Sequence, residues 1–118
     1  EIASWQWRVE FEGLLSIAEA MRNRSPALAG RALPGPVNYA QIPALAERGI
    51  ARLQRFLVDL DERLAGRDFI AASRFSIADI TAVVAIDFAR IVKVQPGDGH
   101  PNVLRWRAAM ALRPAMTL

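Results

Sequence analysis

Few residues of this chain have the types and spacing that catalysis or metal binding needs. The single histidine, His100, stands in a turn directly before Pro101, where capping of a following helix is favoured over catalysis. Glu10 and Glu12 lie two positions apart, so on a helix their carboxylates point in different directions and do not form an acid/base pair. The chain has no cysteine, which excludes thiolate metal sites, cysteine nucleophiles and disulfides. The sequence therefore predicts neither a catalytic site nor a metal site within the chain.

Other residues could bind a ligand without performing chemistry. Trp5, Trp7 and Phe11 could line a pocket for an aromatic ligand, although aromatic residues at helical spacing more often belong to a core or an interface. Asp87 lies in the apolar segment IADITAVVAIDFARIV, where an unpaired buried charge would be costly. Asp87 is therefore expected either to pair with a neighbouring Arg or to face a ligand cleft or an interdomain seam.

Composition indicates one globular domain that does not bind nucleic acid or cross a membrane. The chain has 118 residues, of which 53% are hydrophobic and 23% charged, and its net charge is only +3. The arginines are spread among Asp and Glu without a basic run, which is not typical of a nucleic-acid interface. Apolar runs such as AVVAI at 82–86 are far too short to span a membrane, and the first residues do not have the order typical of a signal peptide. The absence of cysteine fits a cytoplasmic protein, which is the expected location. The first residues are already periodic, so we expect the chain to begin inside a helix, as a fragment of a longer protein.

Apolar periodicity predicts four helices, at about 2–23, 40–65, 77–93 and from 101 to Arg113-Pro114. Stretches rich in Pro and Gly separate them, and no segment has the alternation of a strand. The predicted stripes are Trp7, Phe11, Leu14, Ala18 and Met21 in the first helix, Ile50, Leu53, Leu57, Leu60 and Leu64 in the second, and Ile80, Val84, Phe88 and Ile91 in the third. The third helix is apolar nearly all round, which predicts that it is buried among the others. The expected fold class is all-α.

The stretch RFSIADITAV at 74–83 predicts how the third helix begins. Ser76 stands at the N-cap and Asp79 follows three residues later, which is the pattern of a capping box. Phe75 and Ile80 flank the pair at the positions of a hydrophobic staple. These four residues are expected to serve folding rather than chemistry.

Two motifs in this order make the chain resemble the C-terminal helical domain of cytosolic glutathione transferases. One motif is the capping box with its staple in DFIAASRFSIADITAVVAIDFARIV, and the other is the run HPNVLRWRAAMALRPAM. The second run carries Pro101, Asn102, Trp106, Arg113 and Pro114 at the spacing of the family. The resemblance spans nearly the whole chain and implies a bundle of four main helices over residues 1–118.

The resemblance also implies a longer two-domain parent that acts as a homodimeric glutathione transferase. In this family an N-terminal thioredoxin-like domain, absent from this chain, binds glutathione as co-substrate and lowers the pKa of its thiol. The helical domain contributes the apolar pocket for a small hydrophobic electrophile and much of the dimer interface. The chain alone is therefore expected to bind no cofactor and to be inactive.

By family position, the substrate pocket has one wall on the first helix and another on the third. These walls consist of Arg8, Phe11, Glu12 and Leu15, and of Val84, Asp87 and Phe88. Arg8 could instead form a surface pair with Glu12 four residues later. A second interpretation remains open, because helical domains of this kind also occur as non-catalytic assembly modules in translation factors and aminoacyl-tRNA synthetases.

Overall fold

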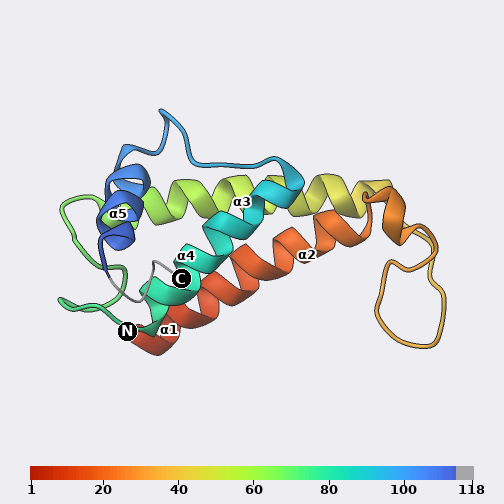
Figure 1. The fold of residues 1–118 in the computed structure, drawn as a ribbon, viewed down its shortest axis with the longest axis horizontal. Helices are drawn as coiled ribbons and strands as arrows, with labels where there is room; N and C mark the ends of the chain where they lie inside the picture. Colours follow the sequence, from red (N-terminus) through yellow and green to blue (C-terminus); the bar gives the residue numbers. More distant parts are fainter. Residues whose placement is uncertain (114–118) are drawn as a thin grey trace.

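The computed structural model describes residues 1–113, and helices make up most of this part of the chain (Figure 1). The first helix is continuous from α1 (Ile2–Arg8) through the π-helical segment η1 (Val9–Leu14) to α2 (Leu15–Arg22), because the residues at both junctions keep right-handed helical dihedral angles. The other elements are the 3₁₀ turn η2 (Pro26–Leu28), α3 (Pro43–Leu64), α4 (Ile77–Phe88) with its 3₁₀ extension η3 (Ala89–Val92), and α5 (Pro101–Ala111). Within residues 1–113 the only β pairing is an isolated bridge between Arg31 and Tyr39, so the all-α prediction is confirmed. Pro114, part of the predicted stop of the last helix, lies outside the described residues.

The helices pack as an elongated bundle with dimensions of 45 × 27 × 26 Å. The first helix packs along α3 through α2, while α4 crosses in front and packs on α1 and η1 (Figure 1). α5 packs on α3 at one end of the bundle, and the loop between α2 and α3 projects from the other end. α4 therefore lies on the N-terminal part of the first helix, and the first helix packs on α3.

α3 supplies the centre of the core. Leu53, Leu57, Leu60 and Leu64 are all buried, and Ile50 packs on them while partly exposed. The leucines recur at steps of three and four, which keeps them on one face of a regular α-helix. The predicted stripe of the second helix is thus confirmed.

The predicted stripe of the first helix is confirmed only in part, because Leu14 and Met21 pack against the core but Trp7 and Phe11 do not. Trp7 and Phe11 are 58% and 42% exposed, whereas Trp5, Val9 and Ile17 are buried. The reason is η1, since a π-helical segment has more residues per turn than an α-helix and keeps positions four apart on one face. Sequence periodicity assumes regular α-helical geometry and therefore selects some of the residues wrongly.

The prediction that α4 is buried on every side is also wrong. Its inner face consists of small and medium side chains, among them Ala78, Ala82 and Ala85, which are almost fully buried. Small residues let a helix approach its neighbours closely, so the larger residues remain on the opposite face. In the part of the chain that the structure describes, the larger residues of this outer face remain between 38% and 55% exposed; they are Ile80, Val84, Phe88 and Ile91.

An ion pair between α2 and α3 makes a prediction about acid stability. Arg48 donates from Nε and Nη2 to the two oxygens of the Glu19 carboxylate, at 3.1 and 2.8 Å. These hydrogen bonds hold the pKa of Glu19 below its ordinary value of 4.5. Because the folded-state pKa is lowered, the pair stabilises the fold above the ordinary pKa, and this contribution is lost as the pH falls through the folded-state pKa.

We therefore expect Arg48→Gln to reduce the dependence of stability on acid pH. Urea unfolding midpoints measured between about pH 5.5 and about pH 3 should fall less steeply for Arg48→Gln than for the wild type. Arg74→Gln is the control, since Arg74 is exposed and forms no ion pair with any residue from 1 to 113. Parallel curves for Arg48→Gln and the wild type would contradict this assignment.

Candidate functional site

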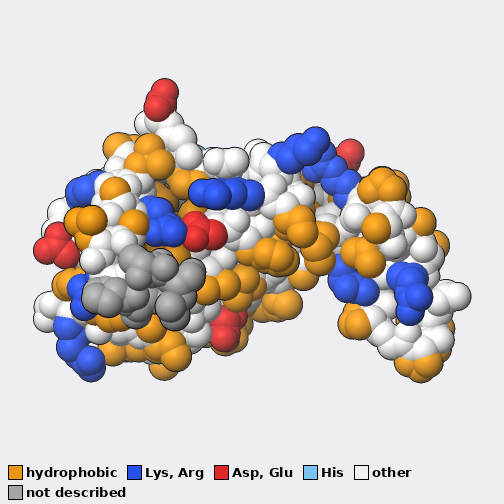
Figure 2. Space-filling view, in the orientation of Figure 1, with side chains coloured by type: hydrophobic (Ala, Val, Ile, Leu, Met, Phe, Trp, Pro, Cys, Tyr) orange, Lys and Arg blue, Asp and Glu red, His pale blue; other side chains and the backbone are white. Residues whose placement is uncertain are grey.

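The candidate site is a group of exposed hydrophobic residues on α4 and the first helix. We call this group the apolar face; it consists of Trp7, Phe11 and Leu15 with Ile77, Ile80, Val84, Phe88 and Ile91, each between 38% and 59% exposed. Figure 2 shows hydrophobic side chains gathered along α4 and the adjoining first helix. A hydrogen bond of 2.8 Å from Gln6 Nε2 to Thr81 Oγ1 joins the two helices. Contiguous exposed apolar surface of this kind marks a binding site or an interface.

Two aromatic rings of the apolar face stack on each other. The rings of Trp7 and Phe11 stack with centroids 4.8 Å apart and planes 11° apart. The Arg52 guanidinium lies 5.1 Å from the Phe11 centroid, and its Nη2 donates to the Phe11 carbonyl oxygen at 3.3 Å. The stack offers a flat apolar surface, and such a surface suits a flat apolar or aromatic ligand.

The charged residues predicted on the first helix lie on its α3 side. Arg8 Nε donates to Glu12 at 2.8 Å, and Arg8 Nη2 donates to Asp59 of α3 at 3.3 Å. The hydrogen bond to Glu12 raises the pKa of Arg8 above its ordinary value. The guanidinium also lies 4.3 Å from the centroid of the Trp5 ring. The alternative pairing of Arg8 with Glu12 is therefore confirmed, and both charges are balanced within the chain.

Asp87 is also paired. Arg107 of α5 donates to its two carboxylate oxygens at 3.0 and 2.8 Å, which is a bidentate ion pair. The hydrogen bond to Asp87 raises the pKa of Arg107 above its ordinary value. The first of the two interpretations of Asp87, a pair with a neighbouring Arg, is confirmed. The pair connects α4 to α5.

The capping box fixes the start of α4. Both halves of the box between Ser76 and Asp79 are present, and Ser76 N–H donates to Asp79 Oδ2 at 3.0 Å. The other oxygen of Asp79 accepts Ile70 N–H and the indole N–H of Trp106, each at 3.0 Å. Asp79 is fully buried and therefore links the loop before α4, the first turn of α4 and α5.

The staple residues differ in burial. Phe75 is partly buried against the core, and the Arg113 guanidinium lies 4.0 Å from the centroid of its ring. Ile80 is exposed and belongs to the apolar face. The direct contact between Phe75 and Ile80 stays a prediction.

Sequence reasoning missed the residue that caps α5. Asp61 of α3 accepts the backbone N–H groups of Asn102 and Val103 at 2.8 and 3.0 Å. His100 occupies the N-cap position, but its side chain makes no capping bond and instead accepts Gly97 N–H through Nδ1 at 3.2 Å. The expected capping by the His100 side chain is therefore wrong. Asp61 lies 41 residues before Asn102, so no local pattern could have identified it.

Residues 1–113 contain neither a cluster of metal-binding side chains nor a membrane-spanning helix. No group of three or more His, Asp and Glu residues in that range could hold a metal ion. No helix there is both long and apolar enough to cross a membrane.

Comparison with known proteins identifies relatives of this fold. The family model described as "Glutathione S-transferase, C-terminal domain" matches residues 26–114. Among solved structures, a Gtt2-class glutathione S-transferase of Vibrio parahaemolyticus is 30% identical with a TM-score of 0.76, over 97% of this chain and 48% of that protein. Gtt2 from Saccharomyces cerevisiae is 25% identical with a TM-score of 0.84, over 98% of this chain and 53% of that protein.

A further relative is the glutathione transferase URE2P5 from Phanerochaete chrysosporium, 25% identical with a TM-score of 0.72, over 98% of this chain and 50% of that protein. The chain thus spans about half the length of the structural relatives that it matches. Among curated proteins, no sequence matches it significantly.

Proposed function

Because the chain belongs to the family of glutathione S-transferase C-terminal domains, we propose that it is the substrate-binding and dimerisation domain of a cytoplasmic glutathione transferase. The observation that carries this proposal is the apolar face, which leaves large hydrophobic side chains of α4 and the first helix uncovered. The relatives are about twice as long as this chain, which supports a second domain as part of the working protein.

The proposed role of each side chain follows from its chemistry, and glutathione binding is assigned to a second domain. Phe11, Leu15, Val84 and Phe88 contact a hydrophobic electrophile, because they are apolar and exposed on the two predicted walls. The three charged residues of these walls already form ion pairs within the chain: Arg8 pairs with Glu12, and Asp87 pairs with Arg107. A preceding thioredoxin-like domain binds glutathione, and the glutathione sulfur attacks the electrophile or exchanges with a disulfide.

The direct test is a conjugation assay on the full-length protein with a panel of electrophiles. We expect glutathione-dependent conjugation of at least one aromatic electrophile, together with retention on immobilised glutathione. Absence of both would overturn the proposal. The sequence that precedes Glu1 is a second check, since a thioredoxin-like domain with an early Ser, Cys or Tyr is expected there.

Phe88→Ala in the full-length protein tests the proposed substrate wall. The substitution removes the contact between the Phe88 ring and the electrophile. It should therefore raise KM for an aromatic electrophile by about tenfold, with little change in KM for glutathione. Leu33→Ala is the control, because Leu33 is also an exposed hydrophobic residue, at 56% against 41% for Phe88, but lies in the projecting loop (Figure 1). If KM for the electrophile is the same in Phe88→Ala and Leu33→Ala, Phe88 is not part of the substrate site.

One observation favours a second candidate, a non-catalytic interaction module. The Trp7–Phe11 stack with Arg52 beside it has the residue types that concentrate binding energy in protein interfaces. In this alternative the apolar face binds another protein instead of an electrophile. A synthetase or elongation-factor sequence before Glu1, together with no conjugation activity, would favour it over the enzyme.

A further inference from the structure

A cavity separate from most of the apolar face lies where the first helix and the η3 extension of α4 end. It has a volume of about 570 Å³ and opens between the end of α2, the turn η2 and the end of η3. Its apolar lining residues are Met21, Pro26, Ala27, Leu28, Ile91 and Val92. Ile91 also belongs to the apolar face, but the other five do not. The volume is within the range of small-molecule pockets, so the cavity is large enough for an organic ligand.

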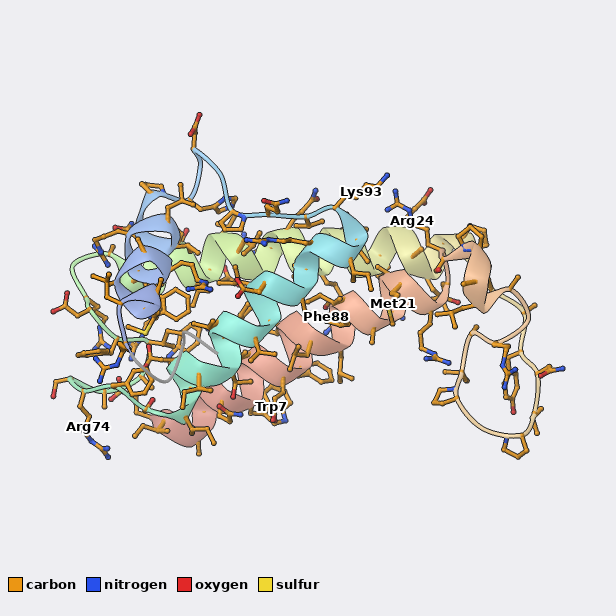
Figure 3. All side chains as sticks on the ribbon, in the orientation of Figure 1. Trp7, Met21, Arg24, Arg74, Phe88 and Lys93 are labelled. Carbon is orange, nitrogen blue, oxygen red and sulfur yellow. The ribbon has the colours of Figure 1, made fainter. Side chains whose placement is uncertain are left out.

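The polar part of this cavity is positive. Arg22, Arg24 and Lys93 line it, and its lining contains no Asp or Glu. Arg22 is already engaged with the carbonyl oxygens of Arg31 and Ala32 at 3.0 and 2.9 Å. Over residues 1–113, neither Arg24 nor Lys93 forms an ion pair. Figure 3 shows both side chains at the same edge of the molecule, near Met21.

The backbone at Lys93 gives an independent indication. Lys93 has φ 60° and ψ 34°, a left-handed conformation, and no other non-glycine residue of the described chain has a positive φ. Glycine or asparagine usually occupies such a position after a helix, because other side chains are strained there. Strained residues persist mostly at sites where the side chain has a function. Lys93 is exposed and lines the cavity, so its ammonium group is available to a bound ligand.

We propose that this cavity binds an amphipathic carboxylate, with its hydrocarbon chain on Met21, Leu28 and Val92 and its head group between Arg24 and Lys93. The apolar lining accounts for the chain, and two cations without an acidic partner account for the charge of the head group. The site requires neither glutathione nor conjugation activity, so it stands or falls separately from the proposed function.

The test uses sodium decanoate as the probe and the ¹³C-methyl NMR signal of Met21 as the readout, in the full-length protein. The signal is assigned with Met21→Leu. We expect saturable shifts of the Met21 methyl group and no shift of Met110, which is buried in α5. Decyltrimethylammonium, with the same chain and the opposite charge, should leave Met21 unchanged.

Variants separate the charges from general hydrophobic binding. Arg24→Gln and Lys93→Gln should each weaken decanoate binding by about tenfold, which is the effect of losing one charge-assisted hydrogen bond. Arg74→Gln is the matched control, because Arg74 lies at the opposite end of the molecule (Figure 3). Equal affinity in Lys93→Gln and the wild type, or equal shifts with the cationic amphiphile, would overturn the proposal.

Lys93→Gly separates loss of the site from loss of the fold. Glycine relieves the left-handed strain, so the melting temperature should rise by about 4 °C while decanoate binding weakens as in Lys93→Gln. A stabilised variant that still binds decanoate with wild-type affinity would show that Lys93 has no part in the site.

Discussion

Asp79→Ala is expected to destabilise the fold by about 4 kcal/mol, because it leaves three buried donors without an acceptor. The carboxylate accepts the backbone N–H groups of Ile70 and Ser76 and the indole N–H of Trp106, all at 3.0 Å. Its side chain is fully buried, so water cannot replace it without opening the bundle. Urea unfolding at neutral pH, followed by circular dichroism, measures the change.

Two further variants separate the role of Asp79 from helix capping alone. Ser76→Ala removes the other half of the capping box and should reduce stability by only about 1 kcal/mol. Trp106→Phe removes one of the three donors to Asp79 and keeps most of the apolar volume, so its effect should lie between the other two. A loss of about 1 kcal/mol or less for Asp79→Ala would show that Asp79 acts as a simple cap.

The two sequence motifs, the capping box with its staple and the run that begins at His100, predicted the fold well. Their side chains contact each other in the structure. Asp79 from the capping box accepts the indole N–H of Trp106 from the second motif. Phe75 and Arg113, again one from each motif, meet with the guanidinium 4.0 Å from the ring centroid. Each motif could be read locally, and together they hold α4 against α5. This contact gives a physical reason why the order and spacing of the two motifs indicate this fold.

The exposed surface was less predictable from the sequence. Hydrophobic periodicity shows that a face is apolar but not what covers it, so it could not distinguish a core from an interface for Trp7 and Phe11, which are both exposed. The π-helical segment η1 cannot be seen in residue spacing, and it changes which residues of the first helix face inward. The ion pair between Asp87 and Arg107 could be anticipated only as a need for some partner, since the partner lies 20 residues away.

The candidate site depends on the position of the first helix, because α4 packs on its α1 and η1 segments while its α2 segment packs on α3. The two helices approach closely at Gly49 of α3, where an added Cβ would lie 2.7 Å from the Ser16 carbonyl oxygen and 2.9 Å from the Ala20 backbone nitrogen. Both atoms belong to the backbone of α2, so neither can move without moving the helix. Gly49 is therefore fixed by packing, although glycine is a poor residue for a helix interior.

Gly49→Ala is accordingly expected to destabilise the fold by about 3 kcal/mol, even though alanine favours the helix by about 1 kcal/mol. Gly13→Ala is the matched control, since its Cβ would meet only the Phe56 ring, at 3.2 Å, and a ring can shift by a few tenths of an ångström. We expect Gly13→Ala to change stability by less than about 1 kcal/mol, because the gain in helix propensity offsets the tight contact. Urea unfolding of both variants measures the difference. Similar losses for the two variants would mean that the backbone contact at Gly49 is no more restrictive than the contact of Gly13 with the Phe56 ring.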